Sequence, residues 1–316
     1  MNASAPADAG CSGLARLKYF LALSRTPHGL LDLATPLMAA ILWLGGLPDA
    51  LTAVIGIVAA FAGYTAVYAL NDIVDYRIDK QKILQAGFHR QQSYLDAVFV
   101  RHPLAQGLIT MPEAIAWAGG WAVISLLAAW HLNPVCALIL VAGCLLETIY
   151  CLLLRVSQLR TLVSGTVKTL GGLAAVFAVD PSPARLPLLL LFLWLFFWEI
   201  GGQNVPADWH DIEEDSALAA KTIPVRYGPR GASIIVLLTL TVSVVLSALF
   251  LGQAKLHLPI PLLMAALAVG CALLLMPGWQ LFRQRQRQQA SALFNRASYY
   301  PVALLAVVAV ALLLKR

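Results

Sequence analysis

Long apolar runs alternate with short polar segments along the whole chain, and this pattern predicts its secondary structure. Nine of the runs approach the ~20 residues that an α-helix needs to cross the hydrocarbon core of a bilayer. The prolines and glycines inside them are tolerated in membrane helices, where neighbouring groups satisfy the freed backbone. The predicted spans cover 28–46, 50–70, 113–131, 134–154, 162–180, 186–204, 232–252, 257–276 and 299–315.

The order of these runs predicts the fold class. We expect an all-α, polytopic membrane protein, with about nine transmembrane helices in a bundle. No low-complexity linker divides the runs, so residues 28–316 are expected to form one transmembrane domain behind a cytoplasmic N-terminal segment, 1–27. That segment lacks the compact apolar core of a cleavable signal peptide, so the first span is expected to act as the membrane signal.

The composition agrees with a membrane protein. Of the 316 residues, 60% are hydrophobic and 12% are charged, whereas soluble domains carry about 25% charged residues. The net charge of +6 comes from basic residues in loops between the apolar runs, so it does not point to a nucleic-acid partner. None of the five cysteines forms a C-x2-C pair, so neither a disulfide framework nor a zinc site is expected.

The basic residues also predict the orientation of the chain. If the N-terminus is cytoplasmic, 17 Lys and Arg residues fall on that side and four on the other, while Lys168 lies inside the fifth span. Cytoplasmic loops carry an excess of Lys and Arg. We therefore expect an integral inner (cell) membrane protein whose second and sixth spans end at the cytoplasm.

Two acidic clusters with one spacing follow those two spans. The first reads Asn71-Asp72-x2-Asp75-x3-Asp79 and the second Asp208-x2-Asp211-x3-Asp215. On a continuous helix, the three aspartates of each cluster would fall within about 60° of one another. Carboxylates this close repel unless a cation lies among them. Oxygen ligands without a matching Cys or His set favour Mg²⁺, which usually completes its shell with water and phosphate.

The clusters occupy equivalent places four spans apart, which indicates a faint internal repeat whose halves could close around one site. Each is followed by a basic residue, a proline and a glycine: Arg101, Pro103 and Gly107 in one case, Lys221, Pro224 and Gly228 in the other. The alternative is a pair of solvated loops with ordinary surface acids. The matching spacing at matching depth favours a two-cluster, magnesium-bridged diphosphate site.

A few polar residues lie within apolar runs and allow two readings each. Lys168 either contacts an anionic ligand or pairs with the acidic clusters, or else extends to the membrane surface; Glu147 is a further candidate partner. Glu199, with Gln203 and Asn204, either extends the polar wall of the site or hydrogen-bonds between helices. The six histidines show no metal-ligand spacing, and the alternating run 283–288 is expected to be a solvated loop.

These motifs resemble the signatures of the UbiA superfamily of intramembrane prenyltransferases. The first cluster matches N-D-x2-D-x3-D, and Asp211-x3-Asp215 followed by Lys221-Thr-x-Pro-Val-Arg226-x-Gly looks like the second signature. The start of the first span, Arg25-Thr-Pro-His-Gly29, and Tyr150-x4-Arg155 are also similar to family patterns. The resemblance spans about 16–316 and implies a nine-helix bundle with a central cavity under a cytoplasmic cap.

One part of the chain departs from the family. Members usually carry Arg-Pro-x2-Ser-Gly within a few residues of the first signature, whereas about twenty residues precede Arg101-His102-Pro103 here, and Gln106 replaces the serine. The insert at 80–100 could lengthen the cap. This difference from the family motif does not affect the expected metal ligands. It concerns which acceptor the protein uses.

The resemblance implies Mg²⁺-dependent transfer of a polyprenyl group from its diphosphate. One Mg²⁺ would be held by Asn71, Asp72, Asp75 and Asp79, and another by Asp208, Asp211 and Asp215. Asp72, Asp75, Asp211 and Lys168 are the expected catalytic residues. Substrate contacts are expected from Arg25, Arg101, Tyr150, Lys168, Asn204, Lys221 and Arg226.

The expected partners are a polyprenyl diphosphate, an aromatic acceptor and the lipid bilayer, with no nucleic acid. A hydroxybenzoate- or naphthoate-like acceptor in quinone biosynthesis fits best, with Arg25 as a candidate for its carboxylate. Two alternatives stay open: a non-aromatic acceptor such as a lipid glycerol or a phosphorylated sugar, and a cation-coupled transporter. Transporters usually place acids near the midplane of broken helices, whereas these acids lie at span ends.

Overall fold

The computed structural model describes residues 13–86, 95 and 99–315, and their regular structure is helical. Within this part of the chain, nine segments are long and apolar enough to cross a membrane, which confirms the predicted fold class. The helices are α1 Gly13–Leu23, α2 Thr26–Asp32, α3 Ala34–Leu44, α4 Ala50–Val74, α5 Tyr76–Ala86, α6 Met111–Leu132, α7 Pro134–Leu152, α8 Arg160–Val179, α9 Arg185–Trp198, η2 Glu199–Asn204, α10 Val205–His210, α11 Ile212–Ala217, α12 Ile223–Gln253, α13 Ile260–Gly270, η3 Cys271–Leu275, α14 Met276–Gln284 and α15 Arg287–Leu314.

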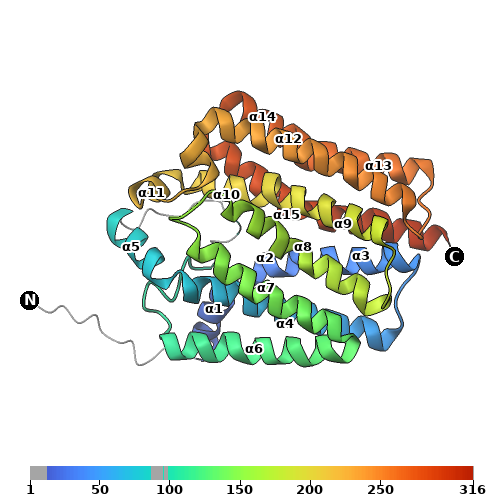
Figure 1. Ribbon diagram of the computed structural model, residues 1–316, viewed down its shortest axis with the longest axis horizontal. Coiled ribbons are helices and arrows are strands. Elements are labelled where there is room, and N and C mark those ends of the chain that lie inside the picture. Colours follow the sequence, from blue (N-terminus) through green and yellow to red (C-terminus); the bar gives the residue numbers. More distant parts are fainter. Residues whose placement is uncertain (1–12, 87–94, 96–98, 316) are drawn as a thin grey trace, which may run out of the picture.

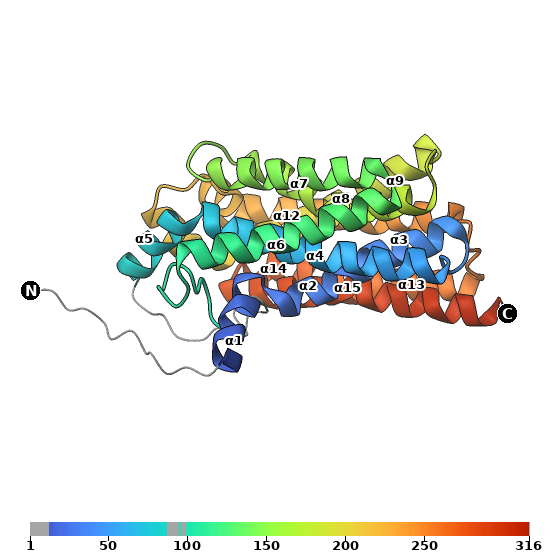
Figure 2. The same ribbon diagram turned by 90° about the horizontal axis from the view of Figure 1, so that it is seen from below.

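The long helices run side by side along one axis of the molecule (Figure 1). Helices α4, α6 and α7 lie along one side, and α12, α13 and α14 along the other. The short helices α5 and α11 contact each other beyond one end of the bundle, where they form a cap. The view turned by 90° shows α1 projecting from the bundle below this end (Figure 2).

Three of the nine spans are divided into separately bounded helical segments, and a proline lies close to each division. Pro36 lacks the N–H that would bond to the Asp32 carbonyl, and the first span divides into α2 and α3 at Leu33, just after that carbonyl. The π-helical segments η2 and η3 are followed by Pro206 and Pro277 near the start of the next α-helix. A π-helical turn inserts one extra residue into the backbone hydrogen-bond pattern of the helix and so changes the direction of the side chains in that turn.

Small residues and buried aromatic rings bring the central helices together. A Cβ added to Gly172 of α8 would lie 2.6 Å from Leu195 Cδ1 of α9, so glycine permits this close approach. Across the other face of α9, Trp194 Nε1 donates to Tyr300 Oη of α15 at 3.2 Å. Membrane helices associate through close packing and interhelical hydrogen bonds of this kind.

Several helices extend beyond the predicted apolar spans. Helix α12 begins at Ile223 rather than 232, with a kink at Gly228, whose φ of 65° suits glycine. Helix α15 begins at Arg287 rather than 299. The additional turns are polar, so hydropathy marks the apolar part of each helix and not its full length.

Candidate active site

A cavity of about 710 Å³ runs through the bundle beneath the α5–α11 cap. Its wall extends from Lys82 and Arg101 at the capped end to Pro48 and Leu132 near the opposite end. Both acidic clusters line it, through Asn71, Asp72, Asp75, Asp79, Asp208, Asp211 and Asp215. The predicted convergence of the two clusters on one site is therefore present in the structure.

Each cluster interrupts its helix at the middle aspartate. Asp75, with φ −83° and ψ 1°, separates α4 from α5. Asp211, with φ −96° and ψ 12°, separates α10 from α11. These angles lie in the bridge region, outside the α-helical range. The expected continuous carboxylate face is thus replaced in both halves by a bend that directs the chain into the cap.

Basic side chains of the first half contact the acids of the second. Lys82 Nζ of α5 lies 2.9 Å from Asp215 Oδ1 and 3.8 Å from Asp211 Oδ2, and Arg101 Nη2 lies 2.6 Å from Asp211 Oδ2. Burial alone would raise the pKa of Asp211, but Arg101 and Lys82 outweigh it and lower the value to about 2. Asp211 is therefore ionised and able to hold a cation at neutral pH.

The first cluster includes a histidine that the sequence pattern did not reveal. His102 Nδ1 lies 2.9 Å from Asp79 Oδ2 and 3.6 Å from Asp72 Oδ1. Burial alone would lower the pKa of His102, but Asp79 and Asp72 outweigh it and raise the value to about 9. Ligand atoms of these three residues all lie within 4.8 Å of one another. The spacing of the histidines in the sequence did not indicate that His102 lies beside these acids, because only tertiary folding brings it there from beyond the insert.

Arg25 joins the same end of the cavity. Its Nη2 donates to Asn71 Oδ1 at 3.1 Å and lies 3.5 Å from Asp72 Oδ1. The Asn71 amide in turn donates to Glu147 Oε1 at 2.6 Å. Arg25 thus interacts with the first acidic cluster, although it was predicted as a contact for an acceptor carboxylate.

Arg160 is a second residue of the cavity wall that sequence reasoning missed. It is buried, its Nη1 donates to Asp208 Oδ1 at 3.1 Å, and its guanidinium lies 3.9 Å from the centre of the Tyr150 ring. The Tyr150 hydroxyl accepts a hydrogen bond from Asn204 Nδ2 at 3.0 Å. The predicted residues Tyr150 and Asn204 therefore line the cavity beside a planar cation suited to phosphate. In the sequence, Arg160 looked like an ordinary loop residue at the start of a span.

The donor set at the capped end suits a hard divalent cation. Asp208 Oδ2 and Asp211 Oδ1 are buried, and neither has a hydrogen-bond partner among the described residues. Burial, followed by the neighbouring Asp79, raises the pKa of Asp75 to about 6. Buried carboxylate oxygens of this kind are stabilised by a metal ion, and oxygen ligands favour Mg²⁺.

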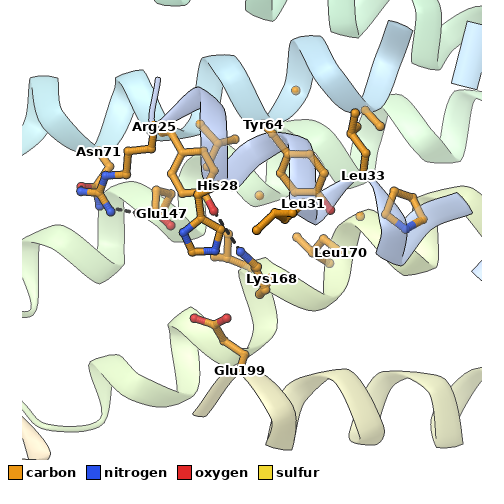
Figure 3. A pocket seen from close by; sticks show the side chains of 18 of the residues that line it. Arg25, His28, Leu31, Leu33, Tyr64, Asn71, Glu147, Lys168, Leu170 and Glu199 are labelled. Carbon is orange, nitrogen blue, oxygen red and sulfur yellow. Dashed lines mark hydrogen bonds between the residues drawn. The ribbon is translucent and has the colours of Figure 1, made fainter. Parts of the chain in front are cut away.

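Lys168 lies deeper in the cavity, away from the clusters. Its Nζ donates to Asp32 Oδ2 at 2.6 Å and to Tyr68 Oη at 2.9 Å. Figure 3 shows Lys168 and Glu199 facing the same part of the cavity, with Arg25 and Asn71 farther along it. Lys168 therefore pairs inside the bundle, but with Asp32 rather than with the acidic clusters or Glu147.

Two of the residues predicted to contact substrate lie outside the cavity. Lys221 and Arg226 are exposed, and the cavity lining does not include them. The backbone N–H of Lys221 donates to the Leu154 carbonyl at 2.7 Å, which fixes the loop before α12. The structure describes only part of the 80–100 insert, so the proposed longer cap lies mostly outside the described residues.

The chain is similar in sequence to prenyltransferases whose names indicate different acceptors. The chain is 32% identical to protoheme IX farnesyltransferase of Desulforudis audaxviator, over 63% of this chain and 62% of that protein. It is 25% identical to digeranylgeranylglyceryl phosphate synthase of Thermococcus kodakarensis, over 73% of this chain and 77% of that protein. It is 27% identical to 4-hydroxybenzoate octaprenyltransferase of Aeromonas salmonicida, over 86% of this chain and 88% of that protein.

Solved structures share the fold. The apo structure of a UbiA homolog from Aeropyrum pernix K1 superposes with a TM-score of 0.70 at 19% identity, covering 91% of this chain and 98% of that one. A UbiA homolog from Archaeoglobus fulgidus bound to DMAPP and Mg²⁺ superposes with a TM-score of 0.65 at 17% identity, covering 92% and 99%. The sequence signature of the UbiA prenyltransferase family matches residues 33–301. With more than half of its length matched, this chain belongs to the UbiA prenyltransferase family.

Proposed function

We propose that this protein transfers a prenyl group from an allylic diphosphate to a small acceptor inside the membrane, in a Mg²⁺-dependent reaction. The observation that carries the proposal is the convergence of two acidic clusters from separate halves of the chain on one end of a single cavity. Family membership supports the same reaction, and the Archaeoglobus fulgidus homolog was solved with DMAPP and Mg²⁺.

At the capped end, different residues would bind the metal ions, contact the phosphate groups and exclude water. Asn71, Asp72, Asp75 and Asp79 would hold one Mg²⁺, with His102 beside them, and Asp208, Asp211 and Asp215 another. When bound, Mg²⁺ neutralises the negative charge that develops on the leaving diphosphate. Arg160 and Lys82 are placed to donate to phosphate oxygens. The apolar wall keeps water away from the allylic carbon.

We propose an aromatic acceptor that carries a hydroxyl group, as in quinone biosynthesis. Similarity to 4-hydroxybenzoate octaprenyltransferase over most of both chains supports this class. Transfer to a lipid glycerol is the second candidate, supported by the similarity to digeranylgeranylglyceryl phosphate synthase. We place the α5–α11 cap at the cytoplasm, because the loops at that end carry most of the basic residues.

The proposal is tested with purified full-length protein, Mg²⁺, allylic diphosphates of 5 to 20 carbons as the assumed chain lengths, and a panel of acceptors that includes hydroxybenzoates, hydroxynaphthoates, phenols and glycerol phosphates. We expect diphosphate release to depend on Mg²⁺, and a prenylated acceptor to appear by mass spectrometry. Absence of Mg²⁺-dependent diphosphate binding and release with every chain length would overturn the proposed function. Product formation with glycerol phosphates alone would select the second candidate.

A further inference from the structure

A polar group of side chains lines the middle of the cavity, beyond the acidic clusters. It consists of the Lys168–Asp32 ion pair, the Tyr68 hydroxyl that bonds to both partners, and Glu199. Much of the remaining wall at this depth and below is apolar, including Leu33 and Leu170. A prenyl chain offers no hydrogen bonds, so it gives these groups nothing to pair with.

This polar group lies close enough to the acidic site to hold a second substrate. Tyr68 precedes Asn71 by three residues on α4, which corresponds to about 4.5 Å along the helix axis. The Arg25 guanidinium, which bonds to Asn71, lies 5.7 Å from the centre of the Tyr68 ring. A small ring held at the polar group would therefore border the diphosphate end of the cavity.

Glu199 presents an oxygen that the protein leaves without a partner. Its Oε1 accepts from Ser164 Oγ at 3.0 Å, whereas Oε2 is buried and has no hydrogen-bond partner among the described residues. The π-helical segment η2 begins at Glu199, so this carboxyl is positioned by a rigid, irregular turn. A buried carboxyl oxygen gains most from a ligand that donates a hydrogen bond.

The charges around the polar group disfavour an anionic ligand. Glu199 lines this part of the cavity with Lys168, whose Nζ lies 2.6 Å from Asp32 Oδ2, so two carboxyl groups accompany one ammonium group. The His28 imidazole lies on the other side of Asp32, with Nε2 3.7 Å from Asp32 Oδ1. Arg25, the other cation proposed for an acceptor carboxylate, interacts with Asn71 and Asp72. A carboxylate placed here would lie beside two acids whose nearby cations are already engaged.

We propose that Glu199, Lys168 and Asp32 form the recognition site for the acceptor, and that this site selects a neutral hydroxyl-bearing ring over a carboxylate-bearing one. Glu199 Oε2 accepts from the acceptor hydroxyl, and the Lys168–Asp32 pair positions the ring beneath the diphosphate. The role of this ligand as the prenyl acceptor rests on the proposed function. The selectivity itself is a binding property that can be measured without any prenyl transfer.

The test compares two ligands that share a phenol: 4-hydroxybenzyl alcohol, which is neutral, and 4-hydroxybenzoate, which is an anion. Dissociation constants are measured by calorimetry on the purified full-length protein, without a prenyl diphosphate. We expect the neutral ligand to bind at least about tenfold more tightly, the scale of one unfavourable charge contact. In Glu199→Gln, the ratio should fall to within about threefold, because one acid is removed.

Lys168→Met has a matched control at the other end of the bundle. Like Lys168, Lys255 pairs with an aspartate and lies near a Trp ring, at 3.9 Å from Asp180 and 6.0 Å from the centre of Trp43. Its side chain is 61% exposed, whereas that of Lys168 is 13% exposed, so it controls for the loss of a lysine outside the cavity. Lys168→Met should weaken binding of the neutral ligand by about tenfold or more, whereas Lys255→Met should leave it within about twofold.

Three outcomes would overturn this inference: tighter or equal binding of 4-hydroxybenzoate, no binding of either ligand, or a ratio that Glu199→Gln does not change. Thermal melting of each variant identifies unfolding, and Glu199→Gln decides the question if Lys168→Met fails to fold. Mg²⁺-dependent binding of geranyl diphosphate is measured in parallel. Its absence would contradict the proposed function, while the selectivity ratio would still decide the nature of the recognition site.

Discussion

Asp75 and Asp211 interrupt two different helices in nearly the same backbone conformation, with φ and ψ of −83° and 1° at Asp75 and −96° and 12° at Asp211. Both line one cavity, and each is the middle aspartate of its cluster. The structure thus repeats the same bend in both halves. This correspondence supports the internal repeat expected from the sequence and gives the two clusters a common architecture.

The first prediction concerns the metal ligands. Asp75→Ala and Asp211→Ala should each lower Mg²⁺-dependent turnover by about 10² or more, the scale of losing one contact to developing charge. Both proteins should remain folded in detergent. Glu213→Ala is the matched control, because this side chain belongs to the same acidic run but is 82% exposed. Near-wild-type turnover of both aspartate variants at limiting Mg²⁺ would rule out the two-cluster site.

The second prediction separates two arginines five residues apart. Arg160 is buried against Asp208 and Tyr150, whereas Arg155 is exposed and donates to Gln81. Arg160→Gln should raise the KM for the prenyl diphosphate by about tenfold or more, because a charge-assisted contact is removed. Arg155→Gln should change it by less than about twofold. Equal effects in steady-state kinetics would remove Arg160 from the diphosphate site.

The third prediction concerns pH and the metal-free protein. The folded-state pKa of His102 is about 9, above its ordinary value of 6.5. Because the pKa is raised on folding, the ion pairs with Asp79 and Asp72 stabilise the protein fully below about pH 6.5, and this contribution is lost as the pH rises through 9.

The measurement is thermal melting in EDTA. The gap in Tm between the wild type and His102→Gln should be largest near pH 6 and close to zero near pH 10. His257→Gln, which changes an exposed histidine at the opposite end, should show no such trend. A gap that is constant with pH would contradict a charged His102 between the two aspartates.

The fourth prediction concerns orientation. Leu84 on the cap and Leu47 at the opposite end are exposed, at 75% and 62%. In a cysteine-free background, Leu84→Cys should react with a membrane-impermeant maleimide only after the cells are opened, and Leu47→Cys should react in intact cells. The expectation follows from the excess of basic residues at the capped end. The reverse pattern would place the acidic site outside the cytoplasm.

The fifth prediction concerns the π-helical segment that carries Glu199. A Cβ on Gly201 would lie 2.3 Å from Thr239 Oγ1 and 3.1 Å from the Val236 carbonyl oxygen. Gly201→Ala should therefore destabilise the protein by about 1–3 kcal/mol, the usual range for overpacking. Gly119→Ala, where a Cβ meets nothing within 4 Å, should be neutral or slightly stabilising in the same melting assay.

Much of this protein follows from its sequence. Runs of about 20 apolar residues can satisfy their backbone in a bilayer only as helices, so hydropathy determined the number and order of the spans. The repeated spacing around Asp75 and Asp211 determined which acids share a site, because both clusters follow equivalent spans. Family signatures in the same segments pointed to the reaction class.

Tertiary structure decided the partners of the buried charges. His102, Arg160 and Asp32 lie far along the chain from Asp79, Asp208 and Lys168, and no local period relates them. Their pairing depends on how the helices pack, and packing also placed Lys221 and Arg226 outside the cavity. The bends at the middle aspartates were likewise invisible to a helical period, because a single residue in the bridge conformation leaves the polar and apolar pattern around it unchanged.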